Sequence, residues 1–365
     1  MSTLRLRPAI LGIPPYVPGK SVNEVTRELG ITRVIKLASN ESVAGPSPRA
    51  LEAVKRHLGE VHRYPEDTSY DLKRALARKL GVEPGNLLLG TGADEVLLLL
   101  GQLFLDPGDE CLYPYPSFSL YRKSALLMAA VPVEAPLRDD RIDVEALLQR
   151  VTPRTKLVFL CNPNNPTGHL VPAREVLSFL DRLPEHVFPV IDEAYAEFVD
   201  EPGFRDAVSL FRQGRRLGAI RTFSKIYGLA GLRVGYAVVP AEIPATADGI
   251  RNSFNISVLA QAAALAALDD EEHVERTRRL TFAGREQLTR GLQAMGLQPI
   301  PSQTNFVCVG IHRSAQEVFQ RLLRRGLIIR PLASFAMPQH VRITVGTEEQ
   351  NAEVLSALKE ELGRG

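Results

Sequence analysis

The sequence predicts an α/β fold in which a large domain, built on a mostly parallel seven-stranded sheet between helices, is joined to a smaller α+β domain. From residue 87 onward, short apolar runs alternate with helical segments, which is typical of a parallel sheet covered on both faces. The 365 residues are enough to bury a large core and to form a second, smaller domain. A long, charged, amphipathic segment at residues 271–294 then leads into a separate unit of strands and helices.

The chain is expected to divide into an N-terminal segment that joins the small domain, a large domain and a small C-terminal domain, at residues 1–45, 46–270 and 271–365. A proline-rich start precedes a helix at 21–29 and a strand at 34–38. The strands of the large domain are expected at 87–89, 110–113, 131–134, 157–161, 187–191, 218–221 and 234–239. Its helices are expected at 49–58, 69–80, 93–104, 117–128, 144–150, 172–182 and 258–267. The C-terminal strands are expected at 305–309, 327–330 and 340–345, with helices at 315–324 and 348–362.

Composition excludes several classes of partner and location. A net charge of +2, from 44 basic and 42 acidic residues, gives no electrostatic reason to expect nucleic acid or an anionic membrane as partner. Cys111, Cys161 and Cys308 are scattered and unpaired in the sequence, which indicates buried thiols in a reducing compartment. The start of the chain lacks an apolar signal segment, and the apolar stretches at 96–105 and 256–268 are too short to cross a membrane. A cytoplasmic protein is expected.

Lys225 lies in a predicted turn between two apolar runs, residues 217–220 and 234–239, among hydroxyls, glycines and an arginine. A lysine with apolar neighbours can lose its proton near neutral pH, and a neutral amine condenses with carbonyls. From this stretch alone, a surface loop lysine is the commoner interpretation. Motifs elsewhere in the chain favour the reactive one.

The segment 90–95, Gly-Thr-Gly-Ala-Asp-Glu, connects a predicted strand to a predicted helix. Its glycines permit a tight turn, so the free N–H groups at the start of the helix face whatever binds there. Such a turn can hold a phosphate, although it matches neither the GxGxxG dinucleotide pattern nor a P-loop. An ordinary turn is the alternative.

Two other strand ends carry polar side chains. Residues 161–168, Cys-Asn-Pro-Asn-Asn-Pro-Thr-Gly, form a rigid loop that presents asparagines at the carboxyl edge of the sheet, where ligands of open α/β sheets bind. Asp192 directly follows a buried strand, where a carboxylate is costly without a partner. Its partner could be a cationic heterocycle or a structural arginine; a metal is less favoured, because Glu193 and His186 are not at ligand spacing.

Together these parts specify pyridoxal phosphate, which needs a lysine, a phosphate site and an acid beside its ring nitrogen. The order of GTGADE, CNPNNPTG, DEAY and SKIYGLAGLRVG resembles the fold-type I aminotransferases, and most closely their histidinol-phosphate aminotransferase branch. The resemblance runs from residues 15–19 to residues 341–346, nearly the whole chain.

The resemblance implies a role for each matching residue. Lys225 would bind the cofactor covalently and move a proton at the substrate, while Asp192 would pair with the ring nitrogen. Tyr195 and Asn165 would contact the phenolic oxygen. The remaining cofactor contacts would be Gly92, Ala93, Asp94, Phe118, Ser224 and Arg233. Tyr64 would reach the cofactor phosphate of the neighbouring subunit, which implies a homodimer with shared active sites.

The resemblance also implies the substrates, histidinol phosphate and 2-oxoglutarate in histidine biosynthesis, with no metal. Arg342 would bind a carboxylate, which suits the planar fork of arginine. Tyr16, Asn40, Asn305 and Arg330 are expected around it, and a surface position is the alternative for Arg330.

Three features depart from the family pattern: the loop at 42–46, Glu66-Asp67 in place of Asp-Gly, and Phe118 where a tyrosine is common. Because they lie around the expected substrate mouth, other activities stay open. These are an aromatic amino acid aminotransferase, a threonine-phosphate decarboxylase, and a relative that binds the cofactor without catalysis.

Overall fold

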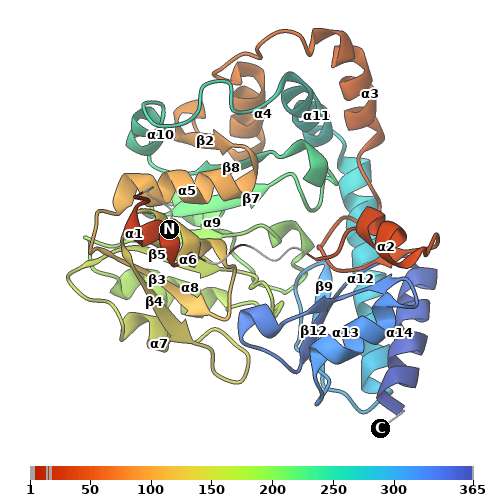
Figure 1. The fold of residues 1–365 in the computed structure, drawn as a ribbon. Helices are drawn as coiled ribbons and strands as arrows, with labels where there is room; N and C mark the ends of the chain where they lie inside the picture. The colour runs from red at the N-terminus through yellow and green to blue at the C-terminus, as the bar shows by residue number, and fades with distance from the viewer. Residues whose placement is uncertain (1–4, 14, 16–18, 364–365) are drawn as a thin grey trace.

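The computed structural model describes residues 5–13, 15 and 19–363, and its largest element is a seven-stranded sheet in the order β2-β8-β7-β6-β5-β3-β4 (Figure 1). The strands are β2 (Leu87–Gly90), β3 (Glu110–Tyr115), β4 (Val131–Pro136), β5 (Thr155–Cys161), β6 (Phe188–Asp192), β7 (Gly218–Thr222) and β8 (Gly235–Val238). Strand β8 runs antiparallel to both neighbours, and the other neighbouring pairs are parallel. The predicted mostly parallel seven-stranded sheet is confirmed.

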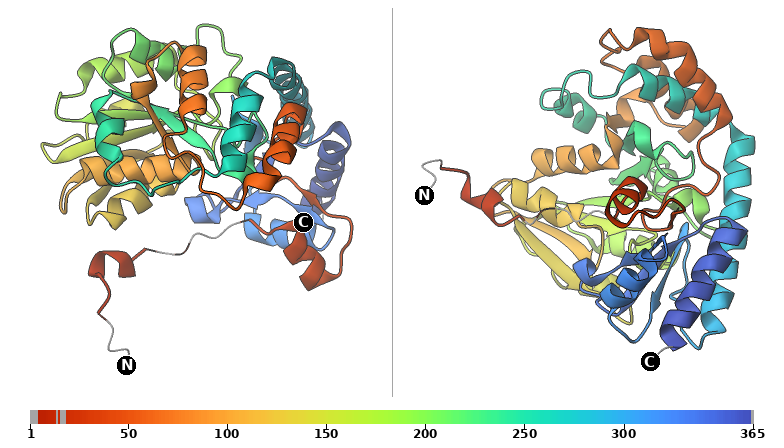
Figure 2. Two further views of the ribbon diagram at one scale, coloured as in Figure 1. Left: turned by 90° about the horizontal axis from the view of Figure 1, so that it is seen from above. Right: turned by 45° about the vertical axis from the view of Figure 1, so that its right-hand side comes forward.

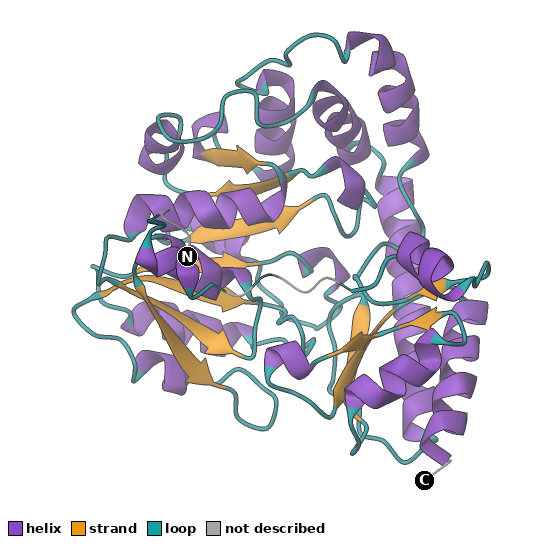
Figure 3. Ribbon diagram, viewed as in Figure 1, coloured by secondary structure: helices purple, strands orange, loops and turns teal. Residues whose placement is uncertain are grey.

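Helices cover both faces of this sheet (Figure 3). On one face, α5 (Gly92–Phe104), α6 (Leu120–Leu127) and α10 (Glu242–Ala247) share a core with Phe159 and Cys161. On the other, α4 (Tyr70–Leu80), α7 (Val144–Leu148), α8 (Ala173–Arg182), α9 (Ala207–Arg212) and α11 (Val258–Leu268) share a core with Val158 and Leu160. Successive residues of β5 thus face opposite layers, which explains why the central strands are continuous apolar runs.

Helix α6 begins at Leu120, three residues later than predicted. Ser117 does not enter the helix because its hydroxyl donates a hydrogen bond to Oδ1 of Asn164, at 2.7 Å, in the loop after β5. Phe118 follows in the same turn and faces a cavity described below. The short helices α9 and α10 were not predicted.

The C-terminal part forms a three-stranded antiparallel sheet, β11 (Arg330–Pro331), β12 (His340–Thr344) and β9 (Phe306–Gly310), flanked by α13 (Ala315–Leu323) and α14 (Glu348–Gly363). The N-terminal segment joins it, because β1 (Ile35–Lys36) pairs with β10 (Leu327–Ile328) and α2 (Val22–Leu29) adds Val25 to the same core. The domain boundaries at 45 and 270 stay predictions.

Helix α12 (Glu271–Gln293) runs along the right side of Figure 1 from the large sheet to α14, while α3 (Pro48–His57) lies at the top and packs on α11. Helix α1 (Pro8–Leu11) contacts α6 and stands out from the body of the molecule in the left view of Figure 2. Arg7 donates to the carbonyl of Leu127 at 3.2 Å. In the part of the chain that the structure describes, no helix is long and apolar enough to span a bilayer.

Candidate active site

Strands β5, β6 and β7 end together at one edge of the large sheet, where Cys161 pairs in register with Asp192 and Asp192 with Ile220. The loops beyond this edge, the start of α5 and the arginines of β11 and β12 enclose a cavity of about 280 Å³. It lies outside the carboxyl ends of parallel strands, the position where open α/β sheets bind ligands. The predicted site residues that line it are Asn40, Ala93, Asp94, Phe118, Asn165, Asp192, Tyr195, Ser224, Lys225, Arg233, Arg330 and Arg342.

Lys225 follows β7 by three residues and is half-buried at the floor of the cavity. Its Nζ donates to the carbonyl of Ser39 at 3.5 Å and lies 5.8 Å from the centre of the Tyr195 ring. Desolvation, reinforced by the positive charge of Arg342, lowers the pKa of Lys225 to about 8. A substantial fraction of the amine is therefore neutral in mildly basic solution.

Asp192 is buried at the end of β6, with both carboxylate oxygens held. The Tyr121 hydroxyl donates to Oδ2 at 2.7 Å, and the Ala194 N–H donates to Oδ1 at 3.2 Å. Burial raises the pKa of Asp192 to about 6, while these hydrogen bonds oppose the shift. The carboxylate is thus fixed in place and mostly ionised at neutral pH, which suits a cationic partner in the cavity.

The first turn of α5 and the loop after β7 form a site for an anion. Ala93 and Asp94 line the cavity at the helix start, and the Arg233 guanidinium donates to Oγ of Ser224 at 3.3 Å. Gly92 permits this arrangement: its φ is +77°, and a Cβ there would lie 2.5 Å from Nη2 of Arg233. Helix-start amides, a hydroxyl and a guanidinium together match the donors that phosphate prefers.

Substituting Gly92 by alanine is expected to weaken binding of pyridoxal phosphate by about tenfold or more, because the new methyl group would displace Arg233 and strain the positive φ. Absorbance titration of the cofactor-free protein measures the dissociation constant. Gly231→Ala is the matched control, since a Cβ at Gly231 would meet no described atom within 4 Å. Equal affinities for the two variants would contradict this anion site.

The small domain closes the cavity with two buried arginines that face each other across β11 and β12, Arg330 and Arg342. The Arg342 guanidinium donates to Oδ1 of Asn165 and, at 2.8 Å, to the carbonyl of Ala38. It also lies over the Phe306 ring, 5.1 Å from its centre. Arg330 is not a surface residue, so the alternative considered from the sequence is wrong.

Asn40 also lines the cavity. Its Nδ2 donates to the Tyr195 hydroxyl at 2.8 Å, and its Oδ1 accepts from the Thr344 hydroxyl at 3.1 Å. Asn305 lies behind the loop rather than on the cavity wall, because its Nδ2 donates to the carbonyls of Asn40 and Glu41. Asn305 thus supports this loop, and its expected contact with the substrate stays a prediction.

Tyr64, another predicted site residue, lies apart from the cavity of its own chain. Tyr64 is 83% exposed and stacks on Phe254, with ring centres 4.7 Å apart. It makes no contribution to the cavity of its own chain, as expected if it serves a neighbouring one. Tyr16 lies outside the described residues.

Several residues that line the cavity were not predicted: Gly19, Ala38, Ser39, Glu41, Cys161, Ala194, Thr222, Ala230 and Phe335. Ser39 and Glu41 flank Asn40, which was expected at the site, so their positions could have been inferred. Tyr121, which holds Asp192, follows Phe118 by three residues in α6. Phe335 has no signal in the sequence, because the path of the small domain alone brings it to the cavity.

A second cavity of about 390 Å³ adjoins the first and shares Phe118, Arg330 and Phe335 with it. Its wall includes Arg122 and Lys123. The site therefore extends beyond Lys225 into a space with additional positive charge.

The residues of the first cavity fit pyridoxal phosphate at each functional group: a donor-rich anion site, an amine of lowered pKa and a fixed carboxylate. Fold and site together define the class of fold-type I, pyridoxal-phosphate-dependent aminotransferases. The model of the family described as aminotransferase class I and II matches residues 32–358. The chain belongs to this family. Within it, the chain groups with the histidinol-phosphate aminotransferases, as the relatives described next show.

The histidinol-phosphate aminotransferase of Moorella thermoacetica is 44% identical over 98% of this chain and 92% of its own length. That of Symbiobacterium thermophilum is 46% identical over 99% of both chains. The crystal structure of histidinol-phosphate aminotransferase from Sinorhizobium meliloti in complex with pyridoxal-5'-phosphate superposes with a TM-score of 0.90 at 32% identity, covering 99% of this chain and 98% of that one. The resemblance described from the motifs is confirmed.

Proposed function

We propose that this protein transfers the amino group of histidinol phosphate to 2-oxoglutarate with pyridoxal phosphate as cofactor, a step of histidine biosynthesis. The observation that carries the proposal is one cavity in which Lys225 and Asp192 of the large domain face Arg330 and Arg342 of the small domain. The relatives named histidinol-phosphate aminotransferase support the choice of substrate.

Bound pyridoxal phosphate supplies an electron sink that stabilises negative charge at the α-carbon of the substrate. Lys225 would hold the cofactor covalently, and its amine would move a proton at the α-carbon of the substrate. Asp192, fixed by Tyr121, keeps the positive charge at the ring nitrogen. Ser224, Arg233 and the first turn of α5 hold the phosphate, so the ring stays aligned while the proton moves.

The two substrates differ in their anionic groups, since histidinol phosphate carries a phosphate and glutamate carries two carboxylates. Arg342 is placed to bind one anion, because guanidinium forks pair with both carboxylate and phosphate. Arg330 borders both cavities and is placed to bind the group at the far end of the substrate. Lys123 adds positive charge on that side, whereas Arg122 there is paired with Glu134 at 3.5 Å. The charge of Lys123 supports a phosphate-bearing donor over an aromatic amino acid.

A panel of amino donors assayed against 2-oxoglutarate tests the substrate. Histidinol phosphate is expected to give the highest kcat/KM, above phenylalanine and threonine phosphate. Turnover of phenylalanine with none of histidinol phosphate would favour the aromatic amino acid aminotransferase instead. Release of carbon dioxide from threonine phosphate would favour the decarboxylase.

Capture of pyridoxal phosphate by the cofactor-free protein is expected to accelerate as pH rises through about 8, because the reactive form of Lys225 is the neutral amine. The rate should rise about tenfold per pH unit well below this value and level off above it. Stopped-flow absorbance measures the rate. In Arg342→Met the midpoint should move upward, because the cation that disfavours the charged lysine is gone. A rate independent of pH from about 6.5 to 9 would contradict the lowered pKa.

We further propose that the active form is a cytoplasmic homodimer with shared active sites, in which Tyr64 contacts the cofactor phosphate of a second copy. Tyr64 is exposed beside other exposed apolar side chains of the same segment, Leu58 and Val61, and its stacking partner Phe254 is also exposed. Such a cluster is typical of an interaction surface. The three cysteines are buried and free, in keeping with a reducing compartment. Sedimentation velocity of the cofactor-loaded protein tests the dimer.

A further inference from the structure

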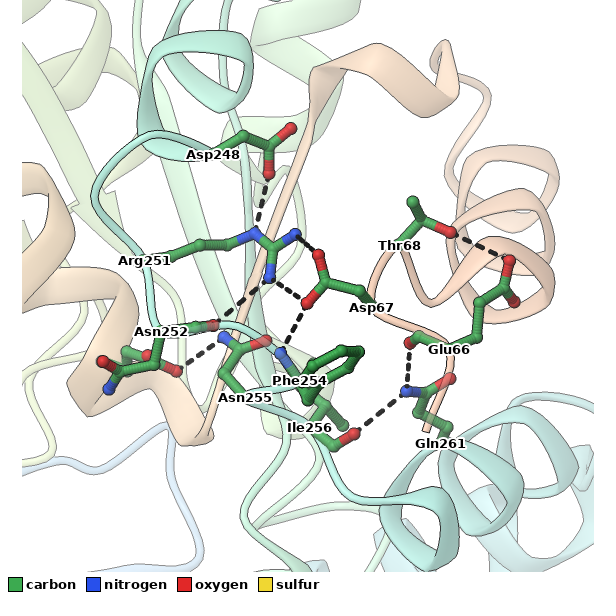
Figure 4. Close-up of polar contacts among 11 residues, drawn as sticks. Glu66, Asp67, Thr68, Asp248, Arg251, Asn252, Phe254, Asn255, Ile256 and Gln261 are labelled. Atoms are coloured by element: carbon green, nitrogen blue, oxygen red, sulfur yellow. Dashed lines mark hydrogen bonds and ion pairs between the residues drawn. The ribbon is translucent and has the colours of Figure 1, made fainter. Parts of the chain in front are cut away.

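The loop that carries Tyr64 is held by an ion pair with a distant part of the chain (Figure 4). Three residues after Tyr64, the Asp67 carboxylate accepts from both Nη atoms of Arg251, at 3.0 and 2.6 Å. The backbone N–H of Phe254, the residue on which Tyr64 stacks, also donates to Asp67. Nε of Arg251 donates to Asp248 at 2.7 Å, so the guanidinium is held on two sides.

The segment that contains Arg251 is itself tied to the first turn of α5. Nδ2 of Asn255 donates to Glu95 at 2.9 Å, and the Thr91 hydroxyl donates to the Asn255 carbonyl at 2.7 Å. Nε2 of Gln261 donates to the Glu66 carbonyl at 2.9 Å, which fixes the Tyr64 loop a second time. Contacts therefore run without a break from the anion site of this chain to the loop that bears Tyr64.

The ion pair between Arg251 and Asp67 is much less exposed to solvent than Tyr64, the side chain whose loop it holds. The side chain of Arg251 is 12% exposed and that of Asp67 37%, whereas Tyr64 is 83% exposed. Hydrogen bonds from Arg251 lower the pKa of Asp67 to about 2, so the pair stays ionised across the physiological range. A pair at this degree of exposure adds little to stability, but a bidentate fork fixes orientation.

We propose that Arg251, acting through Asp67, is a positioning residue that holds Tyr64 in the orientation in which it completes the phosphate site of a second copy of this chain. The proposal rests on the shared-site homodimer proposed above. Residues 61–69 lie outside helix and strand, so an unrestrained Tyr64 would lose conformational freedom on contact. The ion pair removes that freedom beforehand and so raises the affinity for the phosphate.

The test measures the dissociation constant of pyridoxal phosphate for the wild type, Tyr64→Phe, Arg251→Met and the double variant, with sedimentation velocity on each. Tyr64→Phe and Arg251→Met are each expected to weaken binding about tenfold, the change for one lost hydrogen bond to a charged group. The double variant should bind no more weakly than Tyr64→Phe alone, because Arg251 acts through Tyr64. Arg251→Lys should recover part of the loss.

Arg33→Met is the matched control, since Arg33 makes a bidentate pair with Glu353 at the same distances, 3.0 and 2.6 Å, away from the site. It should leave cofactor affinity unchanged. Asp67→Asn is the second variant, for the case in which Arg251→Met folds poorly. It retains an oxygen for the Phe254 N–H and should show the same loss of cofactor affinity as expected for Arg251→Met.

Two results separate the proposals. If Tyr64→Phe weakens binding but Arg251→Met and Asp67→Asn do not, or if the losses add in the double variant, the positioning role is overturned and the shared site stands. If Tyr64→Phe itself binds the cofactor as the wild type does, the shared site and the positioning role are both overturned.

Discussion

Replacement of Lys225 by alanine is expected to reduce kcat/KM for transamination by about 10⁴-fold or more, the largest effect of any single substitution in this chain. In the proposed function the side chain serves twice, as the covalent anchor and as the group that moves the proton. Both functions require the amine at this position, 3.5 Å from the Ser39 carbonyl on the cavity floor. The phosphate site would remain, so the variant should still bind the cofactor, but without a covalent link.

Absorbance before and after borohydride measures the covalent link directly. The wild type should show a visible band that borohydride bleaches, and Lys225→Ala should lack it. Lys156→Ala is the matched control, because Lys156 is half-buried at the opposite end of β5 from the cavity. A bleachable band in Lys225→Ala would place the covalent link on another residue, and would also overturn the proposed role of Lys225.

Substitution of Asp192 by asparagine is expected to lower kcat/KM by about 10²- to 10³-fold. A neutral amide cannot stabilise a positive ring nitrogen, so the cofactor would lose much of its capacity to accept electrons. Tyr121 could still donate to the amide oxygen, so the fold around β6 should persist. Steady-state kinetics with the unfolding temperature recorded alongside separates lost chemistry from lost stability.

Glu193→Gln supplies the control for Asp192→Asn. Glu193 is the next residue and is equally buried, but it turns to the other side of β6 and pairs with Arg221, at 2.8 Å. Burial raises the pKa of Glu193 to about 7, so both acids have shifted pKa values and only one faces the cavity. The folded Glu193→Gln protein should keep most of its rate. If Glu193→Gln lowered kcat/KM as much as Asp192→Asn does, the rate would depend on negative charge in this region rather than on contact between Asp192 and the ring.

The central sheet and the strand-end residues could be predicted because a strand that is buried on both faces is a continuous apolar run in the sequence. Strands β5 and β6 are wholly buried apolar runs, and the polar residues after them can only lie at the edge. The same reasoning locates Lys225 in the loop after β7, whereas the contact of Arg233 with the cofactor was implied by the family resemblance. The pattern of apolar runs therefore predicts where in the fold each loop lies.

The direction of side chains within the roof of the cavity could not be predicted. Asn305 and Arg342 both belong to small-domain motifs, yet one supports a loop and the other lines the cavity. Tyr121 of α6 meets Asp192 at the end of β6 although the two residues are 71 positions apart in the sequence. These outcomes depend on tertiary packing between segments more than 70 residues apart, which local periodicity does not record.

The one antiparallel strand of the large sheet, β8, determines how close together two residues of the site lie in the sequence. Successive parallel strands need a crossover that returns the chain to the opposite edge of the sheet before the next strand starts. Because β8 instead runs back beside β7, the chain stays at the ligand edge for one loop between Thr222 and Gly235. Lys225, the proposed covalent anchor, and Arg233, the proposed phosphate ligand, therefore share one peptide segment. A change in the path of that one segment would therefore alter the positions of both groups.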